Sequence, residues 1–129
     1  MNETYLMKVT AGSEKPMLTV KAEIRGTLAV ISIEGSLINE HMNKMLMLWD
    51  TLMRKKPAII AFDCDLLTTI DSTAIGTIVR FLNETREKNI RLIFFDIDEP
   101  ILHLIQTARL DRFIEITTGE KFRSEFNYG

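Results

Sequence analysis

Cysteine is almost absent from this sequence of 129 residues, because Cys64 is the only one. A single cysteine cannot form an internal disulfide and cannot supply a cage of thiolate ligands to a metal. The chain also lacks any apolar run near the ~18–20 residues that a membrane-spanning helix requires. Residues 1–16 contain no apolar segment of signal-peptide length. We therefore expect a cytoplasmic protein that does not insert into a membrane.

Glycine is also scarce, and charge of one sign does not dominate. The six glycines are scattered, so the sequence has no glycine-rich loop that could cradle a phosphate. The 16 Lys and Arg residues are balanced by 18 Asp and Glu residues, which leaves a net charge of −2. Nucleic-acid binding needs clustered basic residues, and the single basic run, residues 54–56, stands where a predicted helix ends. We expect no nucleic-acid partner.

What is present is the composition of one folded domain. Apolar residues make up 46% of the chain and charged residues 26%, as in ordinary globular proteins, and the length suffices for a single core. A turn-rich segment before Pro16 separates an N-terminal extension, residues 1–16, from a domain over 17–129. Residues 5–9 could add a short strand to it. We find no internal repeat.

The first part of the domain has the pattern of a β-hairpin followed by a helix. Apolar and polar residues alternate over 18–25, as in a half-buried strand. A tight turn at Gly26 leads to the apolar residues 28–33, and Gly35 is expected to end this second strand. Asn39 could then cap a helix that runs to about Met53. The apolar stripe of this helix comprises Met42, Met45, Leu46, Trp49, Leu52 and Met53. Met47 lies off the stripe and could mark a contact surface.

Strands and helices alternate through the rest of the chain. The pattern predicts strands at 58–63, 90–97 and 114–116, and helices at 71–88, 99–108 and 122–126. Strands joined through helices pair in parallel by right-handed crossovers. The fold class is therefore α/β, with a mostly parallel mixed sheet, an N-terminal antiparallel hairpin and helices mainly on one face.

Residues 70–76, Ile-Asp-Ser-Thr-Ala-Ile-Gly, carry the strongest functional signal. An Asp-Ser pair that opens a helix places a hydroxyl beside unpaired backbone N–H groups. Asp71 or Ser72 could simply cap the helix, or Ser72 could accept a phosphoryl group. The helix end favours a phosphate, whereas roughly −1.5 to −2 added charges beside Asp71 would repel a partner that accepts the neutral hydroxyl. The second interpretation describes a switch.

Catalytic constellations are missing from the sequence. The neighbours of Ser72 do not form a Gly-x-Ser-x-Gly elbow, and the two histidines, His41 and His103, are expected at the surface or in packing roles. We predict no catalytic residue, no cofactor and no enzymatic activity.

Three aspartates, Asp63, Asp65 and Asp71, lie at a strand end and in the loop that follows it. Their spacing matches no calcium loop, so we expect turn and capping roles and no metal. A phospho-accepting receiver domain is also excluded, because residues 35–38, Gly-Ser-Leu-Ile, lack its acidic pair.

The segment of strand, Asp-Ser-Thr-Ala-Ile-Gly and helix resembles the signature of the STAS domain of bacterial anti-sigma factor antagonists. The likeness covers residues 18–126, including the first hairpin and the segment Ala-Arg-Leu-Asp-Arg-Phe at 108–113. The resemblance implies a non-enzymatic protein that binds an anti-sigma factor serine/threonine kinase. It also implies that phosphorylation of Ser72 breaks the complex and that a PP2C-type phosphatase restores it. The implied contact surface comprises Asp71, Ser72, Thr73, Ile75 and Gly76 together with Ser36, Leu37, Ile38 and Asn39. A weak homodimer is compatible with this role.

A scaffold that is never switched is the alternative. The family often has an acid where this chain has Ile38, and the loss of that acid, with the Met-rich helix, favours a structural subunit. STAS domains of this kind serve in signalling scaffolds and lipid-transport complexes.

Overall fold

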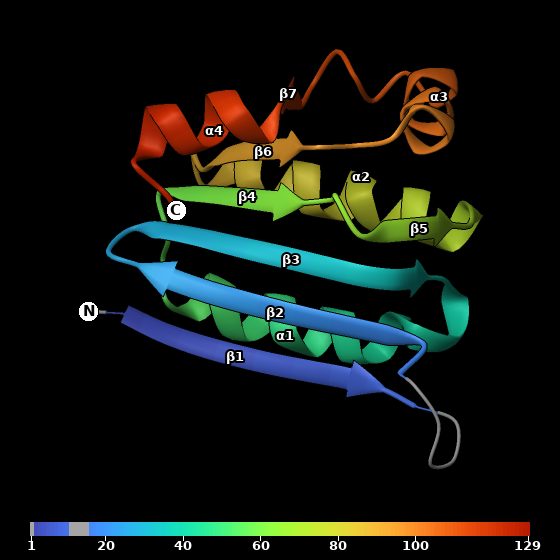
Figure 1. Cartoon of the computed structure of the whole chain (residues 1–129), viewed down its shortest axis with the longest axis horizontal. Helices are drawn as coiled ribbons and strands as arrows, with labels where there is room; N and C mark the ends of the chain where they lie inside the picture. Colours follow the sequence, from blue (N-terminus) through green and yellow to red (C-terminus); the bar gives the residue numbers. More distant parts are fainter. Residues whose placement is uncertain (1, 11–15) are drawn as a thin grey trace.

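Among residues 2–10 and 16–129, which this computed structural model describes, seven strands form one mixed sheet (Figure 1). The strands are β1 (Asn2–Val9), β2 (Leu18–Arg25), β3 (Leu28–Leu37), β4 (Ile59–Asp63), β5 (Leu67–Ile70), β6 (Arg91–Phe95) and β7 (Glu115–Thr117). The helices are η1 (Asn39–His41, a 3-10 turn), α1 (Met42–Arg54), α2 (Ser72–Glu87), α3 (Glu99–Thr107) and α4 (Gly119–Phe126).

The order of strands confirms the predicted fold class. The strands follow the order β1-β2-β3-β4-β6-β7, and β5 pairs with β3 beyond the end of β4. The pairs β1–β2 and β2–β3 are antiparallel, and the remaining pairs are parallel. The predicted hairpin is present and turns at Gly26, whose φ of 60° suits glycine.

Strand β1 is longer than the short strand that the sequence suggests at residues 5–9. It begins at Asn2, and all eight of its residues pair with β2. The segment that the sequence analysis separates as an extension therefore adds a strand to the sheet. Part of the turn-rich segment, residues 11–15, lies outside the described residues.

Gly35 does not end its strand, which corrects the sequence prediction. Strand β3 continues to Leu37, and Gly35 forms an irregularity at which β3 changes partner from β4 to β5. Its φ is 102°, and a Cβ there would overlap the Met17 carbonyl. Only glycine fits such a backbone without strain. Through this irregularity β3 stays in the sheet and pairs with β5. The sequence patterns do not predict β5.

Helices α1, α2 and α3 pack on one face of the sheet, and α4 packs on the other. The larger core includes Trp49 of α1, Phe81 of α2 and Ile105 of α3. On the opposite face, Phe122 of α4 stacks on Phe95 of β6, with ring centroids 4.3 Å apart. The expectation of helices mainly on one face is confirmed.

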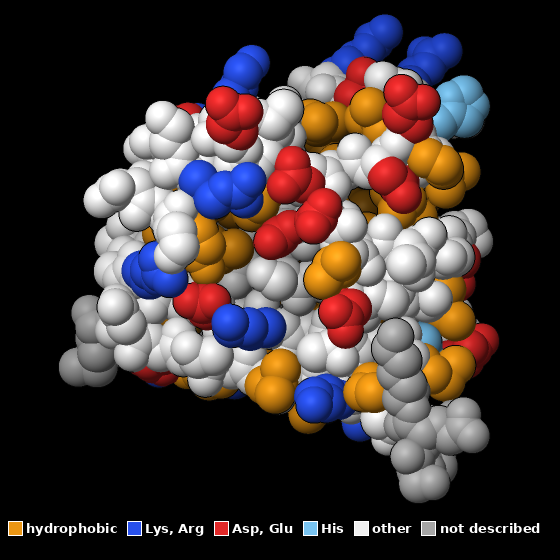
Figure 2. Space-filling view, viewed as in Figure 1, with side chains coloured by type: hydrophobic (Ala, Val, Ile, Leu, Met, Phe, Trp, Pro, Cys, Tyr) orange, Lys and Arg blue, Asp and Glu red, His pale blue; other side chains and the backbone are white. Residues whose placement is uncertain are grey.

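The part of the second face that α4 leaves open is charged. Acidic and basic side chains are interspersed across the described residues in Figure 2. Ion pairs join them, for example Lys21 to Glu23 at 2.9 Å and Arg25 to Glu23 at 3.2 Å.

The first helix starts two residues later than expected. Asn39 opens the short turn η1, and α1 itself begins at Met42 after His41, which makes no side-chain cap bond. The predicted Met-rich stripe is buried as expected at Met42, Met45 and Met53, whereas Met47 is 70% exposed. The helix ends at Arg54, inside the basic run as predicted.

Candidate functional site

Asp71 is the N-cap of α2, as one of the two sequence interpretations expects. Its backbone is extended, and its Oδ1 accepts a hydrogen bond from the Ala74 N–H at 3.0 Å. Strand β5 ends at Ile70, directly before this cap. The bond satisfies one of the free N–H groups in the first turn of the helix.

The same carboxylate joins two segments that are distant in the sequence. Asp71 Oδ2 accepts a hydrogen bond from the Asn39 N–H at 2.9 Å. The hydrogen bonds from Ala74 and Asn39 favour the charged form and lower the pKa of Asp71. Parallel pairing of Ser36 with Thr69 supports the same contact. The loop after β3 and the start of α2, which the sequence analysis places in one surface, therefore lie side by side.

Ser72 is the first residue of α2, and its side chain is exposed. The next hydroxyl, Thr73, is half-buried. A group attached to Ser72 would meet the positive end of the helix dipole and the unpaired N–H groups of the first turn. Of the two hydroxyl groups, that of Ser72 is the more accessible.

The other residues of the predicted contact surface differ in exposure. Gly76 and Asn39 are exposed, whereas Ile75, Ser36 and Ile38 are half-buried. Leu37 is only 4% exposed and belongs to the core. Its side chain therefore packs in the core beneath the loop.

Val79 is an apolar residue on the surface of α2 near Ser72. It is 37% exposed, one turn beyond Ile75 and two turns beyond Ser72 on the same side of α2. Thr77 and Phe81 lie on the buried side of the same helix. Val79 therefore stands at the border between the buried and exposed sides of α2.

His41 fixes the loop rather than offering a free imidazole. It is buried, and its Nδ1 lies 2.7 Å from the Ser36 carbonyl oxygen. His103 is exposed on α3. The packing role and the surface role expected for the two histidines agree with these positions.

The acidic residues before the motif have structural contacts. Asp63 Oδ1 accepts a hydrogen bond from the Asp65 N–H at 3.1 Å. Burial raises the pKa of Asp63, the hydrogen bond from the Asp65 N–H opposes this shift, and the negative charges of Asp65 and Asp96 add to it. Within the described ranges, no three acidic, His or Cys side chains are arranged to hold a metal. Burial also raises the pKa of the Cys64 thiol.

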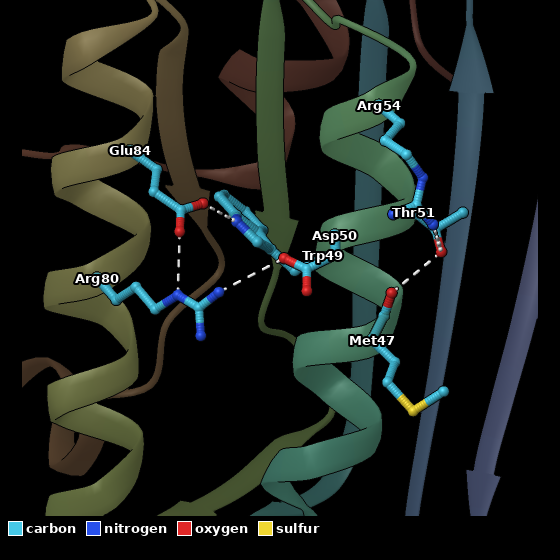
Figure 3. Close-up of polar contacts among 7 residues, drawn as sticks. All are labelled: Met47, Trp49, Asp50, Thr51, Arg54, Arg80 and Glu84. Carbon is cyan, nitrogen blue, oxygen red and sulfur yellow. Dashed lines mark hydrogen bonds and ion pairs between the residues drawn. The ribbon is translucent and has the colours of Figure 1, made fainter.

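Helix α2 is held against α1 by a polar contact beside the aromatic core (Figure 3). The Trp49 Nε1–H donates to Glu84 Oε2 at 2.6 Å, and Trp49 stacks on Phe81 with ring centroids 3.7 Å apart. Arg80 adds exposed contacts to Glu84 at 3.0 Å and to Asp50 at 3.5 Å. These contacts fix the helix whose first turn carries Ser72.

The helices of the described chain are all too short or too polar to cross a bilayer.

Comparison with known proteins gives a consistent family and fold. The model of the STAS domain family matches residues 19–124. No curated protein has a significant sequence match. Three similar solved structures are an anti-sigma factor antagonist from Mycobacterium paratuberculosis and the antagonist SpoIIAA in its unphosphorylated form and, from Bacillus, its phosphorylated form. Their identities are 12%, 14% and 16%, with TM-scores of 0.70, 0.66 and 0.67. The matches cover 83–84% of this chain and 89%, 97% and 98% of the respective structures. At these identities the likeness establishes the fold.

Proposed function

Because this chain belongs to the STAS domain family, we propose that it is an anti-sigma factor antagonist switched by reversible phosphorylation of Ser72. The unphosphorylated protein binds an anti-sigma factor serine/threonine kinase, and a PP2C-type phosphatase reverses the modification. The observation that carries this proposal is the exposed Ser72 at the N-terminus of α2, beside the Asp71 cap. The structural neighbour SpoIIAA, which has been solved in unphosphorylated and phosphorylated forms, supports the same role.

The partner surface that we propose runs from the loop after β3 along the first turns of α2. Its exposed or half-exposed members are Ser36, Ile38, Asn39, Asp71, Ser72, Thr73, Ile75, Gly76 and Val79. The apolar side chains of Ile38, Ile75 and Val79 supply area to bury. Ser72 supplies the point at which a charge can be added. An apolar contact with a neutral hydroxyl inside it is sensitive to phosphate, because a buried unpaired charge is costly.

Phosphorylation of Ser72 is tested by mass spectrometry of the protein after incubation with ATP and its anti-sigma factor kinase. We expect one phosphate, located on Ser72. The variant Ser72→Ala should remain unmodified, and Thr73→Ala should be modified as wild type. A phosphate that stays on Thr73 in Ser72→Ala, or none on wild type, would argue against the proposal.

The contact surface is tested separately with Gly76→Ala. A Cβ at Gly76 would meet no atom within 4 Å, and alanine favours a helix by about 1 kcal/mol. The variant should therefore fold at least as stably as wild type. If the kinase packs closely on α2, the affinity of the variant for the kinase should be at least tenfold lower than that of wild type. Unchanged affinity would show that Gly76 is not part of the surface that contacts the kinase.

A scaffold that is never switched is a second candidate function, and Ile38 favours it. Ile38 is half-buried beside Asn39, in a position where the family often has an acid. An apolar residue there suits a permanent contact better than a charge-sensitive one. Light scattering after size-exclusion chromatography distinguishes the two, because an isolated switch protein should be a monomer or dimer and a scaffold should form larger assemblies.

A further inference from the structure

The outer side of β1 is a long sheet edge. Within the described residues, β1 pairs only with β2, along all eight of its positions. At the opposite edge, β7 has three residues, and β1 contains no proline. A long edge strand without proline presents a row of backbone groups that can pair with another strand.

Two contacts show which backbone groups of β1 point outward. The Val9 carbonyl accepts from the Met17 N–H, on the side of β2. The neighbouring Lys8 carbonyl accepts from Lys44 Nζ of α1 at 3.4 Å. Backbone direction alternates along a strand, so Thr4, Leu6 and Lys8 direct their N–H and C=O groups away from β2.

Apolar side chains flank this edge on both faces of the sheet. Leu6 is 61% exposed and pairs with Lys21 on the face away from α1. On the other face, Met47 of α1 is 70% exposed. Figure 3 shows it pointing away from α2. Met47 borders a groove of about 460 Å³ whose other wall includes Tyr5 and Met7 of β1.

We propose that this edge binds a second copy of the chain by antiparallel pairing of the two β1 strands about a two-fold axis at Leu6. A continuous sheet requires that paired residues lie on the same face. In this register Leu6 pairs with Leu6 of the second copy, and Thr4 pairs with Lys8. The outward N–H and C=O groups of Leu6 then bond to those of Leu6 in the second copy, and those of Thr4 bond to those of Lys8. The Lys8 carbonyl oxygen has two lone pairs, so it can accept from Thr4 of the second copy as well as from Lys44 Nζ. The two Leu6 side chains cover each other, and the two Met47 side chains face the same groove.

Charge along β1 favours a second copy aligned in this direction. On the α1 face of the sheet, Glu3 lies near one end of β1, where its carboxylate pairs with Lys55 at 3.3 Å, and the Lys44 ammonium group lies near the other end. Antiparallel pairing places Glu3 of each copy opposite Val9 of the other, on the face from which Lys44 of that copy reaches the edge. A second copy also brings its own Leu6 and Met47 to the axis, whereas an unrelated extended peptide would have to supply matching apolar residues.

The association is tested by sedimentation equilibrium of the purified chain over a range of concentrations. We expect a reversible dimer of about twice the 14.8 kDa chain mass. Leu6→Lys and Met47→Lys should each weaken the dimer at least tenfold, because each places a charge at the axis or groove. The matched control is Leu104→Lys, since Leu104 is 44% exposed on α3, and it should dimerise as wild type. A monomer at ~1 mM, or equal weakening by all three variants, would overturn the proposal.

A cross-link tests the register. Cys64 is buried, so the wild-type chain should not form an intermolecular disulfide. Leu6→Cys should form a dimer on mild oxidation, because residues paired at the axis lie within the Cα separation of a disulfide. Leu104→Cys should stay monomeric under the same conditions. Equal cross-linking of the two variants, or none in Leu6→Cys, would exclude a two-fold axis at Leu6.

Discussion

The Asp71 carboxylate accepts hydrogen bonds from two backbone N–H groups, that of Ala74 in its own helix and that of Asn39 in the loop after β3. A single side chain therefore caps α2 and ties to it the second segment of the candidate surface. Since Ser72 follows directly, the position of the hydroxyl relative to the loop depends on this carboxylate.

Removing this carboxylate should destabilise the protein more than removing a simple cap. Asp98 provides the comparison, because it caps α3 through one bond, from the Ile101 N–H at 3.1 Å. Asp98→Ala should lower the free energy of unfolding by about 1 kcal/mol. Asp71→Ala should lower it further, since the Asn39 bond is lost as well. Urea denaturation of both variants measures the difference, and an equal or smaller loss for Asp71→Ala would show that the Asn39 bond contributes nothing.

Gly35 should be the glycine least tolerant of replacement. Gly35→Ala combines a positive φ with an overlap on the Met17 carbonyl, and we expect it to cost about 2–4 kcal/mol. Gly26→Ala is the matched control, because Gly26 has a positive φ but no atom within 4 Å of an added Cβ. It should cost about 1–2 kcal/mol. Equal losses in thermal or urea unfolding would mean that β3 can move away from Met17.

Asp63→Asn should stabilise the protein at neutral pH. Burial raises the pKa of Asp63 above its ordinary value of 3.8, so the folded state binds the proton more tightly than the unfolded state does. Wild type therefore loses stability as the pH rises from 3.8 through the raised pKa, whereas the side-chain amide of the variant does not titrate. The amide oxygen can still accept from the Asp65 N–H.

The difference between Asp63→Asn and wild type should be largest at pH 7 and should vanish below about pH 4. Urea unfolding across this range measures it, with Asp111→Asn on the exposed surface as control. A variant that is less stable than wild type at pH 7 would show that the Asp63 charge is stabilising.

The contact between Trp49 and Glu84 should be visible in fluorescence, because Trp49 is the only tryptophan. Glu84→Leu leaves the buried Nε1–H without its acceptor, which should cost about 1–3 kcal/mol and change the emission maximum. Glu84→Gln retains an acceptor and should lose less. Equal effects of the two changes on stability and emission would contradict a role for this hydrogen bond.

The sequence predicts the larger elements because their patterns are local. The alternation over β2 and the apolar stripe of α1 each report burial directly, and Asp71 indicates the start of α2. Strand β5 has only four residues, too few for a clear period. The backbone at Gly35 is constrained by the Met17 carbonyl, and Met17 is distant from Gly35 in the sequence.

The candidate site was predictable in part for the same reason. The Asp71 cap is a local feature, whereas its bond to Asn39 crosses 32 positions of the chain. Burial of Leu37 and exposure of Val79 depend on how α2 packs on the sheet. A helical stripe does not show where its buried side ends.

The central claim is tested most directly by titrating the anti-sigma factor kinase with the protein before and after phosphorylation of Ser72, using isothermal titration calorimetry. Phosphate at Ser72 should weaken binding at least 100-fold, equivalent to about 2.7 kcal/mol, and removal of the phosphate by a PP2C-type phosphatase should restore it. Equal affinities of the phosphorylated and unphosphorylated proteins would contradict the switch.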